Sequence, residues 1–276
     1  MSAVAVSYTV DGPAGAPVVV LSNSLGATRG MWDPQVPPLA ERYRVITYDT
    51  RGHGDSPAPD GPYTLDDLTD DLLALLDEVG ARRAHVVGLS LGGMTAMRLA
   101  ARDPGRVDRL AVLCTSAKTD AQGFLDRAAA ARSGGTAALA PTVVSRWLTP
   151  SFAAGRPELV ARLEGMIAAA DDDGYAACCE VVAAMDLRED LGRITAPTLV
   201  ISGAEDPALP PEHQKAIADG IPGAELLTVS PGAHLANLER PLEVTGALLA
   251  HLDLAGPGRT GTAAGPGRTG ATEGSA

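Results

Sequence analysis

A serine that lies between a strand-like run and a helix-like run constrains the fold more than any other feature. The run Ala84–Val87 is apolar and β-branched, and Leu91–Arg102 follows helical periodicity up to a stop at Asp103-Pro104-Gly105. The turn between them reads Gly88-Leu89-Ser90-Leu91-Gly92. A strand-to-helix turn this sharp needs small neighbours, and it lifts the hydroxyl of Ser90 above the carboxyl end of the strand. The positive end of the following helix lies nearby.

Strands and helices alternate through most of the chain. This alternation favours a mostly parallel sheet covered by helices. Thr64 is expected to cap the second core helix, with Asp67 completing a capping box. The expected strands are Val4–Val10, Pro17–Ser22, Tyr43–Tyr48, Ala84–Val87, Val107–Cys114, Pro197–Ser202 and Ala224–Val229, and the expected core helices are Met31–Arg42, Leu65–Val79, Leu91–Arg102, Pro211–Ala218 and Pro241–His251.

The alternation breaks between Lys118 and Asp190, where Ala-rich helical segments follow one another without a convincing strand. A helical insertion between sheet strands predicts a cap over the core. The chain therefore divides into a first core part (1–117), a helical cap (118–190) and a second core part (191–254). Residues 255–276 are rich in Gly, Pro and Thr, and are predicted to be a disordered tail or the stub of a linker. The expected cap helices are Gly123–Arg132, Ala137–Leu148, Pro157–Ala170 and Tyr175–Ala184.

Composition limits the partners and the compartment. A formal net charge of -12 argues against binding to nucleic acid or to an anionic membrane. It also repels an anionic substrate, which would need a local cationic contact. Cys114, Cys178 and Cys179 show no metal-type spacing and are expected to be free thiols. We find no signal peptide and no stretch long enough to span a bilayer, and we expect a cytoplasmic protein.

A nucleophilic serine needs a histidine base and an acid that orients it. The chain order Ser, Asp, His, with the histidine after the last strand, favours His234 over its competitor His53 in the Gly-rich loop DTRGHGDS. The other histidines are expected elsewhere: His85 opens a strand and faces solvent or a loop, His213 lies on a surface helix, and His251 lies near the end of the last helix.

The acid is expected after a strand that lies between Ser90 and His234. Both Glu205 and Asp206 are candidates, and Asp206 is preferred because Pro207 holds it extended and could aim its side chain towards the histidine.

The oxyanion needs two backbone N–H donors. The first is expected from Leu91, directly after the nucleophile. The second is expected from Leu25 in the loop SNSLGA, where Gly26 gives the turn its freedom. Ser24 in this loop has a strand before it but no helix after it, so it is not predicted to be a second nucleophile.

The chain is identified as similar to the α/β-hydrolases. The similarity rests on SNSLG, DTRGHGDS, GLSLGG, SGAEDPALP and SPGAHLANLERP, which occur in the family order between about Val4 and Leu254. It implies a mostly parallel central sheet flanked by helices, with a helical cap inserted after the sixth strand. Most members carry His-Gly at the oxyanion loop, whereas Asn23-Ser24 stands there in this chain. With LSNSLGATRGMWDPQ, GYAACCE and MDLRED, this pair makes the sequence resemble the 3-oxoadipate enol-lactonases.

This resemblance implies hydrolysis of 3-oxoadipate enol-lactone through an acyl-enzyme, in the bacterial β-ketoadipate pathway of aromatic degradation. The chemistry needs no metal or organic cofactor. The substrate is a small anionic lactone, and Arg146 beside Trp147 is the first candidate to bind its carboxylate. Arg51 is expected to tie loops together below the site.

The fold and the triad do not set the substrate. A general carboxylesterase, a lactonase of other specificity and a cofactor-free haloperoxidase-like enzyme remain alternatives. A non-catalytic binding protein on the same fold is a further alternative, and it predicts a missing triad member.

Overall fold

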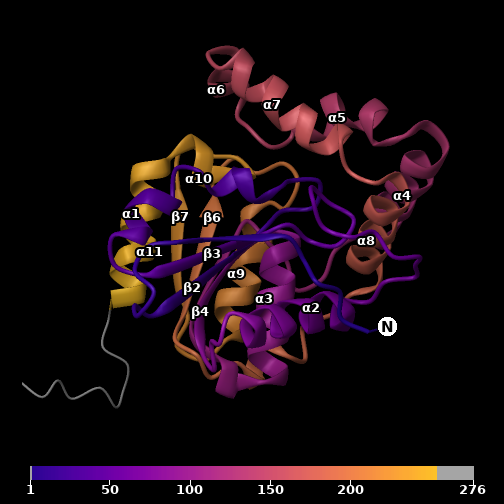
Figure 1. Ribbon diagram of the computed structural model, residues 1–276. Helices are drawn as coiled ribbons and strands as arrows, with labels where there is room; N and C mark the ends of the chain where they lie inside the picture. The colour runs from indigo at the N-terminus through magenta and orange to yellow at the C-terminus, as the bar shows by residue number, and fades with distance from the viewer. Residues whose placement is uncertain (1, 254–276) are drawn as a thin grey trace, which may run out of the picture.

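The computed structural model describes residues 2–253 and has a seven-stranded sheet at its centre (Figure 1). The strand order is β1-β3-β2-β4-β5-β6-β7; β1 runs antiparallel to β3, and the other pairs are parallel. Every residue of β4 and β6 is buried, as expected for parallel strands covered on both faces. The strands are β1 (Tyr8–Asp11), β2 (Val18–Ser22), β3 (Arg44–Tyr48), β4 (Ala84–Leu89), β5 (Val107–Leu113), β6 (Thr198–Gly203) and β7 (Glu225–Val229).

Helices cover both faces of this sheet. On one face, α1 (Val36–Ala40) packs against α11 (Pro241–Asp253), and on the other face α3 (Leu91–Arg102) packs between the strands and α2 (Leu65–Glu78) (Figure 1). Helix α9 (Pro211–Gly220) packs on β6 and β7. These contacts confirm the mostly parallel sheet covered by helices that the alternating pattern predicted. Three short 3₁₀ turns connect elements, at Arg29–Trp32, Pro104–Arg106 and Leu191–Arg193.

The capping box at the start of α2 is confirmed. The backbone N–H of Asp67 donates to the hydroxyl of Thr64 at 3.1 Å, and the carboxylate of Asp67 accepts from the backbone N–H of Thr64 at 2.8 Å. Two N–H groups that have no partner within the helix are satisfied in this way.

Five helices separate β5 from β6 (Figure 1). The insertion follows the fifth strand, β5, so its expected position after the sixth strand is wrong. Among the described residues only one strand, β1, precedes Val18, which makes β5 the last strand before the insertion. Helices α4 and α5 face the loops at the carboxyl ends of the strands across a shared cavity. The five are α4 (Ala121–Gly134), α5 (Thr136–Val144), α6 (Pro150–Ala154), α7 (Pro157–Ala168) and α8 (Asp172–Ala184).

Some elements differ from expectation for identifiable reasons. The strand expected at Val4–Val10 is shorter because the N–H of Val4 donates to Asp71 and the N–H of Ser7 donates to Ser56, both away from a neighbouring strand. The helix expected at Met31–Arg42 is broken by three prolines, which lack N–H donors.

Two short helices were not expected at all. Helix α6 and helix α10 (Ala236–Glu239) span five and four residues, too short for a periodic pattern.

Within residues 2–253, no helix combines the length and the apolar character needed to cross a membrane. The predicted tail or linker stub at 255–276 lies outside the described residues.

Candidate active site

Ser90 occupies the sharp turn between β4 and α3. Its backbone has φ 55° and ψ −117°, in the left-handed range of φ that side chains rarely adopt. The turn is held by the surrounding backbone: the N–H of Ser90 donates to Leu113 at 3.0 Å, and its carbonyl accepts from Thr115 at 2.7 Å. The hydroxyl itself makes no hydrogen bond with the described part of the chain and borders a cavity.

Two glycines make the turn sterically possible. A Cβ at Gly88 would lie 2.2 Å from the carbonyl oxygen of Gly92, and a Cβ at Gly92 would lie 2.2 Å from the carbonyl oxygen of Ser22. The spacing Gly-x-Ser-x-Gly therefore reflects close backbone approach on both sides of the serine.

His234 and Asp206 form a buried pair. Asp206 follows β6 and His234 follows β7, so both side chains lie at the carboxyl edge of the sheet with Ser90. Nδ1 of His234 lies 2.8 Å from Oδ2 of Asp206, and the side chains are 4% and 0% exposed. Oδ1 of Asp206 accepts from the N–H groups of Ala208 and Leu209, which fixes the carboxylate.

The carboxylate of the neighbouring Glu205 does not take part in the buried pair with His234. Glu205 is exposed, whereas Asp206 is buried. A carboxylate at Nδ1 selects the imidazole tautomer in which Nε2 is the proton acceptor.

Ser90 and His234 line the same cavity of about 490 Å³. No hydrogen bond joins Ser90 Oγ to His234 Nε2 among the described residues. In enzymes without bound substrate this contact is commonly long and shortens in the complex.

The two loops proposed to form the oxyanion hole are joined directly. The N–H of Gly92 donates to the carbonyl of Asn23 at 2.9 Å. The neighbours of Leu25 are both engaged, since the N–H of Ser24 donates to Met31 Sδ and the N–H of Gly26 donates to His53 Nε2. Within residues 2–253 the N–H of Leu25 has no partner, and the N–H of Leu91 belongs to the first turn of α3, where none is available.

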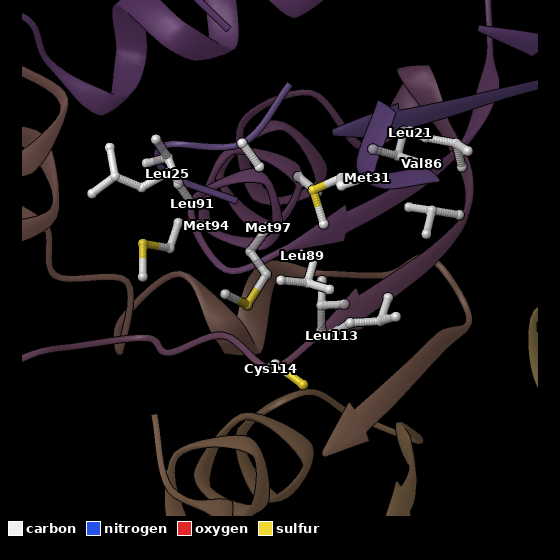
Figure 2. Packing of buried hydrophobic residues seen from close by; sticks show 14 of the residues in the cluster. Leu21, Leu25, Met31, Val86, Leu89, Leu91, Met94, Met97, Leu113 and Cys114 are labelled. Carbon is white, nitrogen blue, oxygen red and sulfur yellow. The ribbon is translucent and has the colours of Figure 1, made fainter. Parts of the chain in front are cut away.

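Apolar packing supports this pair of loops. Figure 2 shows Leu25 and Leu91 together with Met94 and Met97 of α3 and Leu113 of β5, all buried in one cluster. Burial of side chains on both loops limits their movement relative to each other.

His53 supports the oxyanion loop, and it does not border the cavity. Its Nε2 accepts the N–H of Gly26 at 2.9 Å, so Nδ1 carries the proton and donates to the carbonyl of Arg51 at 3.1 Å. Burial lowers the pKa of His53 below its usual value of 6.5, which keeps Nε2 an acceptor.

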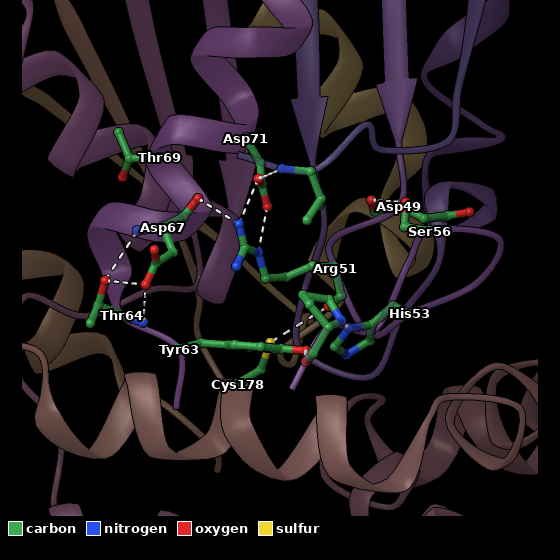
Figure 3. A network of polar contacts seen from close by, with 12 residues as sticks. Asp49, Arg51, His53, Ser56, Tyr63, Thr64, Asp67, Thr69, Asp71 and Cys178 are labelled. Atoms are coloured by element: carbon green, nitrogen blue, oxygen red, sulfur yellow. Dashed lines mark hydrogen bonds and ion pairs between the residues drawn. The ribbon is translucent and has the colours of Figure 1, made fainter. Parts of the chain in front are cut away.

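Arg51 ties the loop to α2, as expected. Its guanidinium binds both carboxylate oxygens of Asp71 at 2.6 Å, and it lies over the ring of Tyr63 (Figure 3).

Three expectations about the remaining histidines can be compared with the structure. Of the two positions expected for His85, the solvent-facing one is wrong: His85 is buried edge-on against the ring of Tyr43, in the turn before β3, with 5.7 Å between centroids, so it faces a neighbouring loop. His213 is on a helix as expected, but it borders the cavity, and its Nδ1 lies 2.8 Å from Ser116 Oγ. His251 is buried on α11 and contacts the carbonyl of Leu110 through Nε2.

Glu239 is a supporting residue that the sequence did not single out. Its carboxylate accepts from the N–H of Ala233, next to His234, at 2.9 Å. It also accepts from the N–H and the hydroxyl of Thr149, at 3.1 and 2.6 Å. A buried carboxylate therefore connects the histidine loop to the end of the cap segment that carries Arg146 and Trp147. The sequence offered one signal for Glu239, which is its position within the motif SPGAHLANLERP.

The cap contributes one wall of the cavity. Trp147 is buried, and its carbonyl accepts from the N–H of Leu235, beside His234. Arg146 is exposed and borders the same cavity. So does Arg127 of α4, which the sequence analysis did not identify; nothing in its surroundings in the sequence sets it apart from other arginines of the cap.

Side chains suited to metals are not grouped in the described chain: residues 2–253 hold no cluster of three or more His, Cys, Asp or Glu that could bind an ion. The three cysteines are free and buried. Burial raises the pKa of Cys179 to about 11 and raises the pKa of Cys114 and Cys178 further.

Comparisons with known proteins agree with this geometry. The model of the alpha/beta hydrolase fold family matches residues 17–241. The sequence is 40% identical over 239 residues to 3-oxoadipate enol-lactonase 2 of Acinetobacter baylyi, covering 86% of this chain and 89% of that protein.

Two solved structures are also similar. The enol-lactonase of Burkholderia xenovorans superposes with a TM-score of 0.88 at 40% identity, covering 90% of this chain and 96% of that chain. A thermophilic esterase from Thermogutta terrifontis, with malate bound, superposes with a TM-score of 0.83 at 29% identity, covering 90% and 92%.

Proposed function

The chain is a hydrolase of the α/β-hydrolase fold family, and from that membership we propose that it hydrolyses 3-oxoadipate enol-lactone through an acyl-enzyme at Ser90. The observation that carries the proposal is the 2.8 Å contact between His234 Nδ1 and Asp206 Oδ2, at a cavity that Ser90 and His234 both line. The relatives named above supply the substrate class, a cyclic enol ester that carries a carboxylate.

Acylation begins when Ser90 Oγ attacks the lactone carbonyl carbon and His234 Nε2 takes the hydroxyl proton. Asp206 holds Nδ1–H and stabilises the imidazolium that forms. The carbonyl oxygen becomes an oxyanion, and the N–H groups of Leu25 and Leu91 donate to it. Among residues 2–253 neither N–H group has a protein partner, which supports this role.

The tetrahedral intermediate collapses by breaking the bond between the carbonyl carbon and the ring oxygen. The oxygen leaves as an enolate, takes the proton from His234, and the enol becomes a ketone. The leaving group stays attached to the acyl chain because the ester was cyclic. His234 then takes a proton from water, and the hydroxide attacks the acyl carbon. The bond between this carbon and Ser90 Oγ breaks, His234 returns the proton to Oγ, and 3-oxoadipate is released.

A substrate panel tests the proposal. We expect loss of the ultraviolet absorbance of the enol-lactone at a kcat/KM well above that for simple 4-nitrophenyl esters. Ser90→Ala should lower kcat by about a million-fold, and its folding, measured by circular dichroism, should be unchanged. Efficient hydrolysis of the simple esters with none of the enol-lactone would contradict the substrate assignment.

A carboxylesterase of wider specificity is a second candidate, favoured by the similarity to the Thermogutta terrifontis esterase. It uses the same steps, with an alcohol that departs as a separate molecule. The same panel separates the two, because a general esterase would prefer neutral acyl chains that fill the apolar part of the cavity.

A further inference from the structure

Two arginines border the cavity, and their guanidinium groups have different surroundings. Nη2 of Arg146 donates to the carbonyl of Pro207 at 2.8 Å, and the side chain is exposed. Nε of Arg127 donates to the hydroxyl of Tyr175, and the guanidinium lies over the Tyr175 ring at 5.2 Å from its centroid. Arg146 is thus attached to the loop of Asp206, whereas Arg127 is attached to a cap helix.

Arg127 carries an unmet donor and an unpaired charge. Its Nη2 is out of contact with solvent and has no acceptor among the described residues, where it also has no carboxylate partner. A buried donor left without an acceptor costs about 1–3 kcal/mol, and more when it is charged. Arg51 also has one unmet nitrogen, but its charge is paired with Asp71 and it does not border the cavity.

The position of Arg127 relates it to the oxyanion loop. A Cβ at Gly26 would lie 3.1 Å from Cε2 of Tyr175, so the ring that supports Arg127 packs directly against that loop. Ser24, Leu25 and Arg127 border the same cavity. The charge is therefore held on the side of the cavity where the lactone carbonyl would bind.

The other polar groups of the cavity suit a carboxylate less well. The hydroxyl of Ser116 donates to the carbonyl of Lys118 at 2.6 Å, so Nδ1 of His213 must donate to Ser116. The remaining nitrogen of a neutral His213 is then an acceptor, which a carboxylate does not satisfy. Asp120 carries a negative charge, and its side chain accepts the N–H of Gln122 at the start of α4.

We propose that Arg127 binds the free carboxylate of the substrate and so sets the preference for anionic lactones and esters. Tyr175 is its positioning residue, because it holds Nε and leaves Nη1, which is not among the buried unpartnered atoms, for the ligand. The assignment of carboxylate binding to Arg127, in place of Arg146, rests on the proposed function, which is acyl transfer at Ser90. It also accounts for an anionic substrate on a chain of net charge -12, because a local cationic contact offsets the general repulsion.

The test compares two esters that differ only in charge, mono-4-nitrophenyl adipate and its methyl ester, in Arg127→Met, Arg127→Lys and the matched control Arg146→Met. Arg127→Met should lower kcat/KM for the charged ester about 10- to 100-fold, mainly through KM, and change the neutral ester about twofold or less. Arg127→Lys should recover part of the loss, because it keeps the charge without the fork. Arg146→Met should affect both esters equally.

Calorimetric binding of adipate provides a readout that needs no turnover. Arg127→Met should weaken adipate binding by a similar factor, and Arg146→Met should leave it nearly unchanged. Equal losses on the two esters in Arg127→Met, or a selective loss in Arg146→Met, would overturn the assignment. A wild type that binds adipate and prefers the charged ester but ignores the enol-lactone would reject the proposed lactone and keep the role of Arg127.

Discussion

At the scale of single residues, the site depends on groups that lack their usual partners. Ser90 has a strained backbone and a free hydroxyl, and the N–H of Leu25 has no partner within residues 2–253. Each is held in place by neighbours that do have partners, such as Gly26 and His53. Rigidly held donors that have no other partner can stabilise the charge that develops in a transition state, because the protein does not need to reorganise when the reaction occurs.

The choice of Asp206 over Glu205 is testable at this scale. Asp206→Asn should lower kcat by about 1,000- to 10,000-fold, because an amide at Nδ1 favours the wrong imidazole tautomer. Glu205→Gln is the matched control, and as an exposed change it should alter kcat by about twofold or less. Steady-state kinetics on one ester suffices, and a large loss in Glu205→Gln alone would reassign the acid.

At the scale of elements, the cap and the histidine loop are joined through Glu239. Its carboxylate accepts from the N–H of Ala233 and from two donors on Thr149, at the end of the cap segment that includes Trp147. The carbonyl of Trp147 adds a further bond from the N–H of Leu235. These bonds attach the wall of the cavity to the loop that carries His234.

Glu239→Gln should lower the free energy of unfolding by about 1–3 kcal/mol and reduce kcat, because an uncharged amide meets its three donors less well. Glu243→Gln on α11 is the control: this carboxylate pairs with Arg240 at the surface and should contribute about 0.5 kcal/mol or less. Urea unfolding measures the stability of the two variants, and ester kinetics measures their kcat. If the two variants behave alike, the carboxylate of Glu239 does not join the cap to the loop.

At the scale of the whole molecule, buried histidines make stability depend on pH. Burial is the main cause that lowers the pKa of both His53 and His251 below 6.5. Below about pH 6.5 the unfolded chain therefore binds more protons than the native chain, and the free energy of unfolding falls as the pH falls. The carboxylates of Asp66, Glu180 and Asp186 have lowered pKa values, so their contribution is lost only at lower pH.

Unfolding free energies measured between pH 5 and 6.5 should isolate the histidines. We expect a positive slope with pH of up to about 1.4 kcal/mol per pH unit for each of His53 and His251. His53→Gln should show a shallower slope than the wild type, because it removes one of the two histidines whose pKa burial lowers. An unchanged slope in His53→Gln would mean that folding does not lower the pKa of His53.

The sequence alone was sufficient for the fold class and for the chain order of the site. Buried parallel strands and core helices have local periodicities, and the capping box of Thr64 and Asp67 spans four residues, so both can be recognised without tertiary information. The sharp turn at Ser90 was equally local. The assignments of Ser90, Asp206 and His234 as catalytic residues stay predictions, and the geometry supports them.

Only the tertiary structure decided which side chains meet across the chain. Thr149 and Glu239 are 90 positions apart, and Arg127 and Tyr175 are 48 positions apart. Val4 meets Asp71 at a separation of 67, which shortens the first strand. Local periodicity carries no information about such pairs, because their contacts depend on how the cap packs on the sheet. The sequence therefore predicted where the chemistry lies, and only the packing of the cap shows that Tyr175 holds Arg127 at the wall of the cavity.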